Sequence, residues 1–288
     1  MSGILRILIA EGNAGHRCVE LTKAGACGGA ECHERTLEAL FPGIAITMAN
    51  VADADGALPS GADIGAFDGV ILGGSALHIP DIDTDSRIRR QIDFAAAVFE
   101  TGVPFFGSCW GFQVGVAAAG GTVIESPRGR ELGLARKITL TDAGRGHPMY
   151  QDKATVFDAP AVHLDEVTHL PSGSVVLASN AHCAIQAATV SHAGGTFWGV
   201  QYHPEFDLDH MAGLIGCYAE GFVKGGFFAD EAAAHAHAED FETLHNDPER
   251  QDLAWLLGID DDVLDAGRRT REIENWITRA VLPQKASS

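Results

Sequence analysis

The sequence predicts an α/β fold in which helices cover both faces of a mostly parallel β-sheet. Two observations lead to this prediction. In the first half of the chain, short apolar runs alternate with longer segments of helical periodicity, which is the pattern of βαβ units. Between residues 122 and 196 the runs are shorter and are separated by turns, which indicates an antiparallel extension of the sheet. A chain of 288 residues is long enough to bury a substantial core.

The apolar runs define the expected strands in order. They fall at residues 6–10, 44–49, 69–72, 104–107, 135–140, 174–178, 184–189 and 197–201. Helices are expected at residues 31–41, 85–100, 111–118 and 208–223. In open α/β sheets, functional sites form beyond the carboxyl ends of the strands. The residues that follow these runs are therefore the first candidates for function.

The last part of the chain differs from the rest. Residues 228–288 are expected to form a C-terminal helical extension of a first domain that spans residues 1–227. We expect the extension to pack on the core, and the alternatives are a dimer surface or a lid near the site. Helical patterning runs over 228–244, is broken at residues 246–248, and resumes at 251–257 and 261–279. The apolar residues at helical spacing are Leu253, Leu256, Leu257, Ile273, Trp276 and Ile277.

The stretch Gly107-Ser108-Cys109-Trp110-Gly111 ends an apolar run and is followed by a helix-compatible segment. Glycines two residues before and two after a nucleophile are what a sharp strand-to-helix turn requires, because a side chain there would collide with neighbouring backbone. Cys109 at the tip would lie at a helix N-terminus, where the helix dipole favours the reactive thiolate. A buried structural cysteine is the alternative.

A second motif, Gln201-Tyr202-His203-Pro204-Glu205-Phe206, follows the last apolar run. In an extended chain, residues two apart point to the same side, so Glu205 could orient His203. Pro204 between them suits the end of a strand better than a helix. Cys109, His203 and Glu205 together would make a nucleophile, a base and a carboxylate that orients the base.

These two motifs resemble those of the class I glutamine amidotransferases, the Cys-His-Glu glutaminases. A third landmark of that family is also present, in the strand and Gly-Gly loop of Phe67-Asp-Gly-Val-Ile-Leu-Gly-Gly-Ser-Ala76. The resemblance extends from about residue 4 to about residue 225 and implies a flavodoxin-like core. Within the family, the chain resembles the glutaminase domains of GMP synthases and the γ-glutamyl amide hydrolases.

The resemblance also implies roles for particular residues. Cys109 would attack the γ-carbonyl of a γ-glutamyl amide, His203 would shuttle the proton, and Glu205 would fix the imidazole. The backbone N–H groups of Gly74 and Trp110 would form the oxyanion hole. Residues expected to bind the substrate are Gln113, His163 and Asp165, and for Asp165 a solvated loop carboxylate is the alternative.

Composition restricts the possible partners and cofactors. The net charge of −19 disfavours nucleic acid and anionic membrane surfaces as partners. No run approaches the ~18 apolar residues of a membrane helix, so a cytoplasmic location is expected. Six cysteines in so long a chain do not indicate a disulfide framework, and Cys27, Cys32 and His33 lack the spacing of a zinc site. The sequence has no Walker A loop and no dinucleotide fingerprint, so we expect no metal and no cofactor.

Three functions remain open at this stage. Trp110 and the Ser75-Ala76-Leu77-His78 loop depart from the usual family pattern and favour, by a small margin, a stand-alone hydrolase of γ-glutamyl amines. The second possibility is a glutaminase subunit that delivers ammonia to a separate synthase. The third is a catalytically silent regulatory module, against which the complete triad argues. The substrate is expected to be a small γ-glutamyl molecule, and a homodimer is possible.

Overall fold

The computed structural model describes residues 4–287 and confirms the α/β prediction. A nine-stranded sheet has the order β2-β1-β3-β4-β11-β10-β9-β6-β7. The first five strands in this order run parallel to one another, and the remaining neighbours pair antiparallel. The parallel strands are β2 (Ala45–Asn50), β1 (Arg6–Glu11), β3 (Gly69–Leu72), β4 (Phe105–Ser108) and β11 (Gly195–Val200). The antiparallel extension comprises β10 (Ala187–His192), β9 (Ser174–Ser179), β6 (Glu131–Leu140) and β7 (Val156–His163). A separate two-stranded sheet pairs β5 (Thr122–Glu125) with β8 (Asp165–His169).

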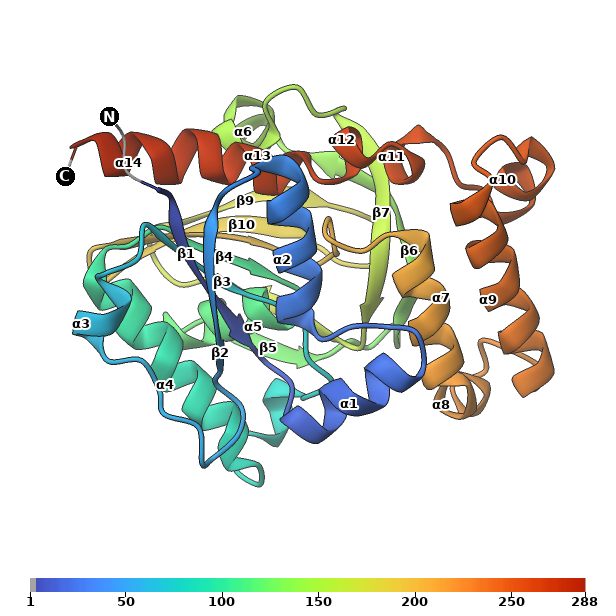
Figure 1. Cartoon of the computed structure of the whole chain (residues 1–288), viewed down its shortest axis with the longest axis horizontal. Coiled ribbons are helices and arrows are strands. Elements are labelled where there is room, and N and C mark those ends of the chain that lie inside the picture. The colour runs from blue at the N-terminus through green and yellow to red at the C-terminus, as the bar shows by residue number, and fades with distance from the viewer. Residues whose placement is uncertain (1–3, 288) are drawn as a thin grey trace.

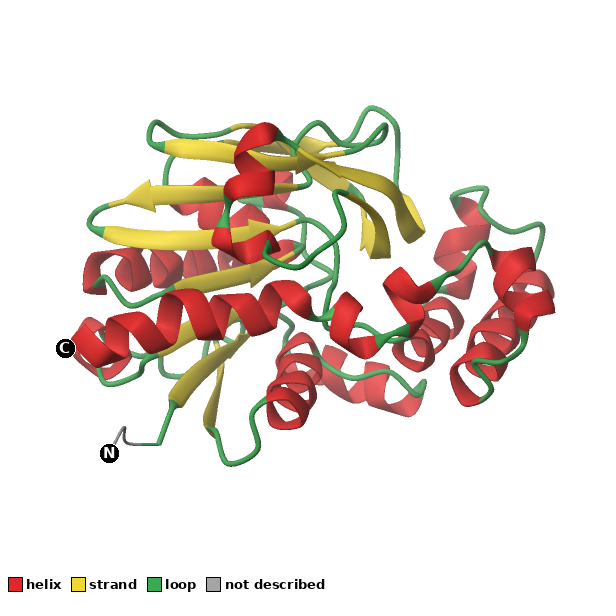
Figure 2. Cartoon of the chain, turned by 90° about the horizontal axis from the view of Figure 1, so that it is seen from above, coloured by secondary structure: helices red, strands yellow, loops and turns green. Residues whose placement is uncertain are grey.

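Helices lie on both sides of the large sheet (Figure 2). Alternate residues of β1 face opposite sides: Leu8 joins one apolar core and Ile7 joins the other. The core around Leu8 is closed by α4 (Ser86–Thr101) and α5 (Trp110–Ala118). The core around Ile7 is closed by α2 (Gly29–Leu40) and by the C-terminal helices α13 (Arg271–Trp276) and η3 (Ile277–Val281, a π-helix). This layered arrangement fixes the carboxyl ends of the parallel strands, where the candidate site forms.

A third apolar cluster lies beside the sheet. It joins α7 (Leu208–Cys217) and α8 (Ala219–Lys224) to α9 (Glu231–Asn246) and α10 (Gln251–Leu257). In Figure 1, α9 and α10 lie beyond α7 and far from β1 and β3. The remaining helices are α1 (Gly15–Lys23), α3 (Gly61–Ile64), η1 (Ile79–Asp81), α6 (Asp142–Gly146), η2 (Pro148–Tyr150), α11 (Asp261–Leu264), α12 (Ala266–Arg269) and α14 (Leu282–Ser287).

The C-terminal segment therefore divides between two places. Its first helices extend the cluster beside the sheet, whereas Trp276 is fully buried against the sheet itself. A Cβ atom at Gly69 would lie 2.8 Å from the Trp276 ring, so a larger residue at this position of β3 would displace the ring. Of the apolar stripe expected from the sequence, Leu253 is buried but Leu256 is 73% exposed. The expected helix over 261–279 is interrupted between α11, α12 and α13.

The expected strands are all present, with small shifts at their ends, and three further strands were missed. The missed β7 contains Pro160, and β7 is the outermost strand of the sheet, where a missing N–H is tolerated. The predicted helix over 208–223 is divided at Tyr218 into α7 and α8. Among residues 4–287, no helix is both long enough and apolar enough to cross a membrane.

Candidate active site

Cys109 is the tip of a strained turn between β4 and α5. Its backbone has φ 50° and ψ −104°, a conformation that side-chain-bearing residues rarely adopt. A Cβ atom at Gly107 would lie 2.6 Å from the carbonyl carbon of Gly111, and one at Gly111 would collide with the Leu72 carbonyl group. Both glycines are thus required by close backbone approach, as the sequence predicted. The Cys109 N–H donates to the carbonyl of Val200 at 2.8 Å, which ties the turn to the end of β11.

His203 follows β11 and is held on several sides. Its backbone N–H donates to the carbonyl of Pro160 at 2.8 Å, and its ring stacks on Phe206 with centroids 3.7 Å apart. Its Nδ1 lies 2.7 Å from Oε1 of Glu205, so the two residues of the His-Pro-Glu motif do pair. Both side chains are buried.

The pKa values of His203 and Glu205 are shifted in opposite directions, so both side chains are charged at neutral pH. Burial lowers the pKa of His203, but the charge of Glu205 and the interactions with Cys109 raise it more, to about 10. Burial raises the pKa of Glu205, yet the nearby His33 and His203 rings lower it to about 2. Burial also lowers the pKa of His33, so at neutral pH His203 is the cation that the Glu205 carboxylate faces.

Sequence reasoning missed two residues behind this pair. The Ser108 hydroxyl donates to Oε1 of Glu205 at 2.7 Å, and Nε2 of His33 lies 3.0 Å from the same hydroxyl oxygen. His33 comes from α2, far from the motif in sequence, and it lies 3.5 Å from Glu205. Ser108 was visible inside the motif, but no spacing rule connects His33 to it. The two residues hold the carboxylate that orients His203.

The Gly73-Gly74 loop follows β3 and faces His203. A Cβ atom at Gly74 would lie 2.9 Å from Cε1 of His203, so the loop main chain runs directly beside the imidazole. Trp110 is the first residue of α5, and the first N–H groups of a helix have no partner within the helix. The indole of Trp110 donates to Gln91 at 2.7 Å, which fixes the side chain away from the turn.

A cavity of about 240 Å³ opens in front of Cys109. It brings together all the predicted site residues except Glu205, which lies behind the imidazole of His203. The predicted residues that line it are Gly74, Cys109, Trp110, Gln113, His163, Asp165 and His203.

Asp165 is buried in the cavity wall and is not the solvated loop carboxylate that the sequence left as an alternative. Its Oδ2 accepts the N–H of Ile79 at 3.2 Å and lies 3.4 Å from Nδ1 of His78. The hydrogen bond with Asp165 raises the pKa of His78, although burial opposes the shift. The second oxygen of Asp165, Oδ1, has no hydrogen-bond partner. Asp165 thus has one buried acceptor that no protein group uses.

His163 and Gln113 are engaged within the protein. Nδ1 of His163 lies 2.9 Å from the Asp165 carbonyl oxygen, and Nε2 lies 2.9 Å from the Glu131 carboxylate. Nε2 of Gln113 donates to the Asp165 carbonyl at 3.0 Å and to Gln201 at 3.2 Å. These bonds hold the main chain at Asp165 in place.

Arg130 also lines the cavity and is not among the residues predicted to bind the substrate. Its guanidinium lies 5.9 Å from the ring centroid of Phe222 on α8. Besides the His203 imidazolium, the cavity therefore has the Arg130 guanidinium and the Asp165 carboxylate in its wall. An apolar side of the cavity is formed by Leu21, Leu214, Tyr218 and Phe222.

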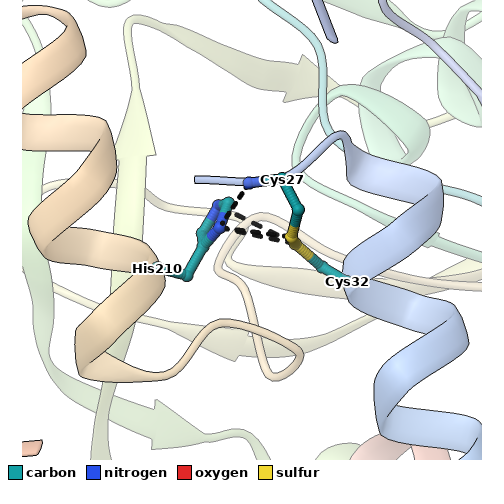
Figure 3. Close-up of side chains that lie close together, drawn as sticks. All are labelled: Cys27, Cys32 and His210. Carbon is teal, nitrogen blue, oxygen red and sulfur yellow. Dashed lines mark hydrogen bonds between the residues drawn. A yellow bond between two sulfur atoms is a disulfide. The ribbon is translucent and has the colours of Figure 1, made fainter. Parts of the chain in front are cut away.

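Cys27, Cys32 and His33, which are close in sequence, do not form one cluster in the structure. His33 faces Ser108, and Cys27 is joined to Cys32 by a disulfide beside His210 of α7 (Figure 3). This bond links residues only five apart in sequence, so it fastens one loop and is not a framework. Cys27 and His210 also line the cavity in front of Cys109.

Comparison with known proteins now identifies the class. Residues 53–213 match the glutamine amidotransferase class-I family model, and the chain belongs to that family. It is 36% identical to a γ-glutamyl-L-1-hydroxyisopropylamide hydrolase from Pseudomonas sp. over 97% of this chain and 94% of the relative. It is also 36% identical to the GMP synthase of Salmonella typhimurium, but over 48% of this chain and only 25% of that enzyme.

Solved structures support the same fold. A glutamine amidotransferase from Thermotoga maritima matches with a TM-score of 0.65 at 14% identity, covering 96% of this chain and 99% of that one. A glutamine amidotransferase from Methylobacillus flagellatus matches with a TM-score of 0.57 at 20% identity, covering 96% and 94%. At such low identities the likeness concerns the fold alone.

Proposed function

We propose that the chain hydrolyses γ-glutamyl amides through a thioester on Cys109. The observation that carries the proposal is the buried His203–Glu205 pair, which shares a cavity with a cysteine at a strained strand-to-helix turn. A nucleophile, a base and a residue that orients the base are the components of a covalent acyl-transfer mechanism.

In the first step, Cys109 attacks the γ-carbonyl carbon as the thiolate, with the proton held on His203, and a C–S bond forms. The carbonyl π electrons move to the oxygen, and the resulting oxyanion accepts hydrogen bonds from the backbone N–H groups of Gly74 and Trp110. Because its pKa is about 10, His203 already carries a proton at neutral pH. It gives that proton to the nitrogen as the C–N bond breaks, so that a neutral amine or ammonia leaves.

In the second step, His203 is neutral and takes a proton from water. The resulting hydroxide attacks the thioester carbon, the C–S bond breaks, and glutamate leaves. Glu205 accepts the Nδ1 hydrogen bond throughout and stabilises the imidazolium in both steps. Ser108 and His33 act as positioning residues because they hold Glu205 and do not reach the substrate.

Two charged groups suit the amino-acid end of the substrate. The Asp165 carboxylate, whose Oδ1 has no partner within the protein, would accept the α-ammonium group, and the guanidinium of Arg130 would pair with the α-carboxylate. Gln113 and His163 would keep Asp165 in place through its carbonyl oxygen. In this assignment they support the substrate site from behind and do not contact the glutamyl group.

The apolar side of the cavity favours a stand-alone hydrolase of γ-glutamyl amines over a glutaminase subunit. Ammonia needs no apolar wall, whereas Leu21, Leu214, Tyr218 and Phe222 give the cavity one. The full-length hydrolase relative agrees with this choice, whereas the GMP synthase similarity covers only a quarter of that enzyme. A glutaminase subunit of a separate synthase remains the second candidate, supported by that partial similarity.

The deciding experiment uses the purified chain alone. Glutamate, ammonia and amine release are measured with glutamine and with a series of γ-glutamyl alkylamines. We expect a higher kcat/KM for alkylamides than for glutamine. Activity that appears only when a synthase is added would support the glutaminase subunit. No turnover under any condition would support the catalytically silent regulatory module.

A matched pair of variants tests the apolar wall. Phe222→Ala should lower kcat/KM for γ-glutamyl alkylamides by about tenfold relative to glutamine, since pocket contacts of this size contribute roughly 1–3 kcal/mol. Trp255→Ala, on an aromatic side chain that is 77% exposed and outside the cavity, is the control and should leave the ratio unchanged. Equal losses for both substrates would show that Phe222 is not a specificity residue.

A further inference from the structure

The Cys27–Cys32 disulfide has no part in the proposed mechanism, yet it lies between two cavities. Cys27 lines the cavity in front of Cys109, and both cysteines line a second cavity that also reaches Glu205. The bond connects the loop before α2 to the first turn of that helix (Figure 3). It therefore forms part of the wall between the active site and a separate opening.

His210 lies against both sulfur atoms. Its Nδ1 is 3.4 Å from Sγ of Cys27 and 3.5 Å from Sγ of Cys32, and it accepts the backbone N–H of Cys27 at 3.3 Å. Burial, together with the charge of His203, lowers the pKa of His210 to about 4, so the ring is neutral and Nδ1 is an acceptor. If the disulfide is reduced, either buried thiol has a hydrogen-bond acceptor within reach.

The disulfide encloses residues 28–31, and Gly29 in this segment packs against the Gly73-Gly74 loop. A Cβ atom at Gly29 would lie 2.8 Å from both the main-chain nitrogen and oxygen of Gly74, so the two backbones touch. A chain of hydrogen bonds makes the same connection. The Ala30 N–H donates to Glu11 at 2.9 Å, Asn13 donates to the other oxygen of Glu11 at 2.9 Å, and Asn13 also donates to the Gly74 carbonyl at 3.2 Å.

We propose that Cys27 and Cys32 are a reversible thiol-oxidation site, and that the disulfide holds the Gly74 loop in the geometry that hydrolysis requires. Reduction frees the loop before α2 from the first turn of the helix. Gly29 is then less firmly held against Gly74, whose N–H the proposed function places in the oxyanion hole. The activity part of the inference thus rests on the proposed function, whereas the redox part does not.

The chemistry is a thiol–disulfide exchange with a small dithiol or a dithiol reductase. A thiolate of the reductant attacks Sγ of Cys27, a mixed disulfide forms, and Sγ of Cys32 leaves with the electron pair. Cys32 lies in the first turn of α2, where the helix dipole stabilises a leaving thiolate. The second thiol of the reductant then displaces Cys27. Two electrons and two protons pass to the cysteines, and the reductant becomes a disulfide.

The test is a redox titration of the unaltered protein in buffers of reduced and oxidised dithiothreitol. A chelator is present because two thiols and His210 are also a donor set suited to Zn²⁺. Alkylation under denaturing conditions and mass spectrometry give the fraction of Cys27 and Cys32 that is reduced, and kcat is measured on the same samples. We expect kcat to fall roughly tenfold as the pair is reduced, a fraction of the cost of losing an oxyanion donor, with KM changed less than about twofold.

Matched variants separate this pair from the other cysteines. The double change Cys27→Ser and Cys32→Ser should show the kcat of the reduced form in every buffer. The double change Cys18→Ser and Cys217→Ser removes two free, half-buried cysteines and should leave the response intact. A pair that does not interconvert in these buffers, or a kcat that changes less than twofold while it does, would overturn the inference.

The redox site can be judged even if the proposed function fails. Should no γ-glutamyl amide be hydrolysed, the rate at which iodoacetamide labels native Cys109 is compared in the oxidised and reduced protein. A change of several-fold that the Cys27→Ser and Cys32→Ser protein lacks would support a link between the pair and the active site. Equal labelling rates would reject that link.

Discussion

Cys109 at the strand-to-helix turn and Trp276 in the C-terminal helices are both buried, but what surrounds them differs. Around Cys109, the buried groups are polar: the His203 ring, the Glu205 carboxylate, the Ser108 hydroxyl and the His33 ring. Around Trp276, the neighbours in the same core are apolar strand residues such as Ile7, Ile71 and Phe106. Burying polar groups costs free energy that their hydrogen bonds only partly offset, whereas burying apolar surface stabilises the fold.

The comparison separates residues that serve chemistry from residues that serve stability. The strained backbone of Cys109 and the buried ionised pair are features that a protein selected for stability alone would lack. Trp276 has the opposite character, because it closes the apolar face of β3 from a segment outside the family motifs. Substitutions in the two regions should therefore affect different measurements.

Replacement of Cys109 should have the largest effect on activity and a small one on stability. Cys109→Ala removes the nucleophile, and we expect hydrolysis to fall by at least about 10⁴-fold, as in other enzymes that lose a covalent nucleophile. Alanine keeps the Cβ atom, so the strain of the backbone at this position stays nearly the same. Tm should therefore change by no more than a few degrees. Initial rates and thermal unfolding measure the two quantities.

The double variant Cys109→Ala plus His203→Ala tests whether the two residues act in one step. Effects of residues that work as a unit are strongly non-additive, so the double variant should be little slower than either single one. Losses that multiply would show that His203 has a structural role, and full activity in Cys109→Ala would reject the thioester.

Replacement of Trp276 should have the reverse profile. Trp276→Ala leaves a large cavity against the sheet, and we expect a loss of about 3–5 kcal/mol in the free energy of unfolding. The folded fraction should keep an unchanged kcat, because the ring lies in an apolar core and does not line the cavity in front of Cys109. Denaturant unfolding gives the stability, and Trp255→Ala is the matched control. Trp255 is 77% exposed, so its loss should cost less than about 0.5 kcal/mol.

Glu205→Gln should give an intermediate effect that depends on pH. The amide keeps the shape but removes the charge, so we expect a loss of up to about 10⁴-fold in kcat, the mildest of the three triad changes. The main charge that raises the pKa of His203 to about 10 is that of Glu205. The alkaline limb of the wild-type rate profile should therefore lie near pH 10 and move to lower pH in the variant. A limb that does not move would contradict the assignment.

The same shifts set the pH dependence of stability. The folded pKa of His203 is raised from 6.5, so its contribution is fully present below pH 6.5 and is lost as the pH rises through about 10. The folded pKa of Glu205 is lowered from 4.5, so its contribution is present above pH 4.5 and is lost as the pH falls through about 2. Both contributions are complete only between about pH 4.5 and 6.5.

Local patterns account for what the sequence could predict. The elbow glycines, the His-Pro-Glu spacing and the strand periodicity are short-range features, and the structure places Cys109, His203 and Glu205 as these features indicated. His33 could not be found, because its contact with Ser108 depends on how α2 packs on the sheet. The same holds for the position of Trp276, since an apolar stripe does not reveal which surface buries it.

The first half of the C-terminal segment provides the smallest and most discriminating test. Leu253 and Leu256 share the short helix α10, but Leu253 is buried in the cluster beside the sheet and Leu256 is 73% exposed. We expect Leu253→Ala to cost about 2 kcal/mol, the low end for a buried leucine, because a peripheral cluster can partly collapse around the loss. Leu256→Ala should cost less than about 0.5 kcal/mol in a monomer. A cost of less than about 0.5 kcal/mol for Leu253→Ala as well would show that burial of Leu253 in this cluster adds no stability. A cost for Leu256→Ala that grows with protein concentration would instead place α10 in a dimer interface.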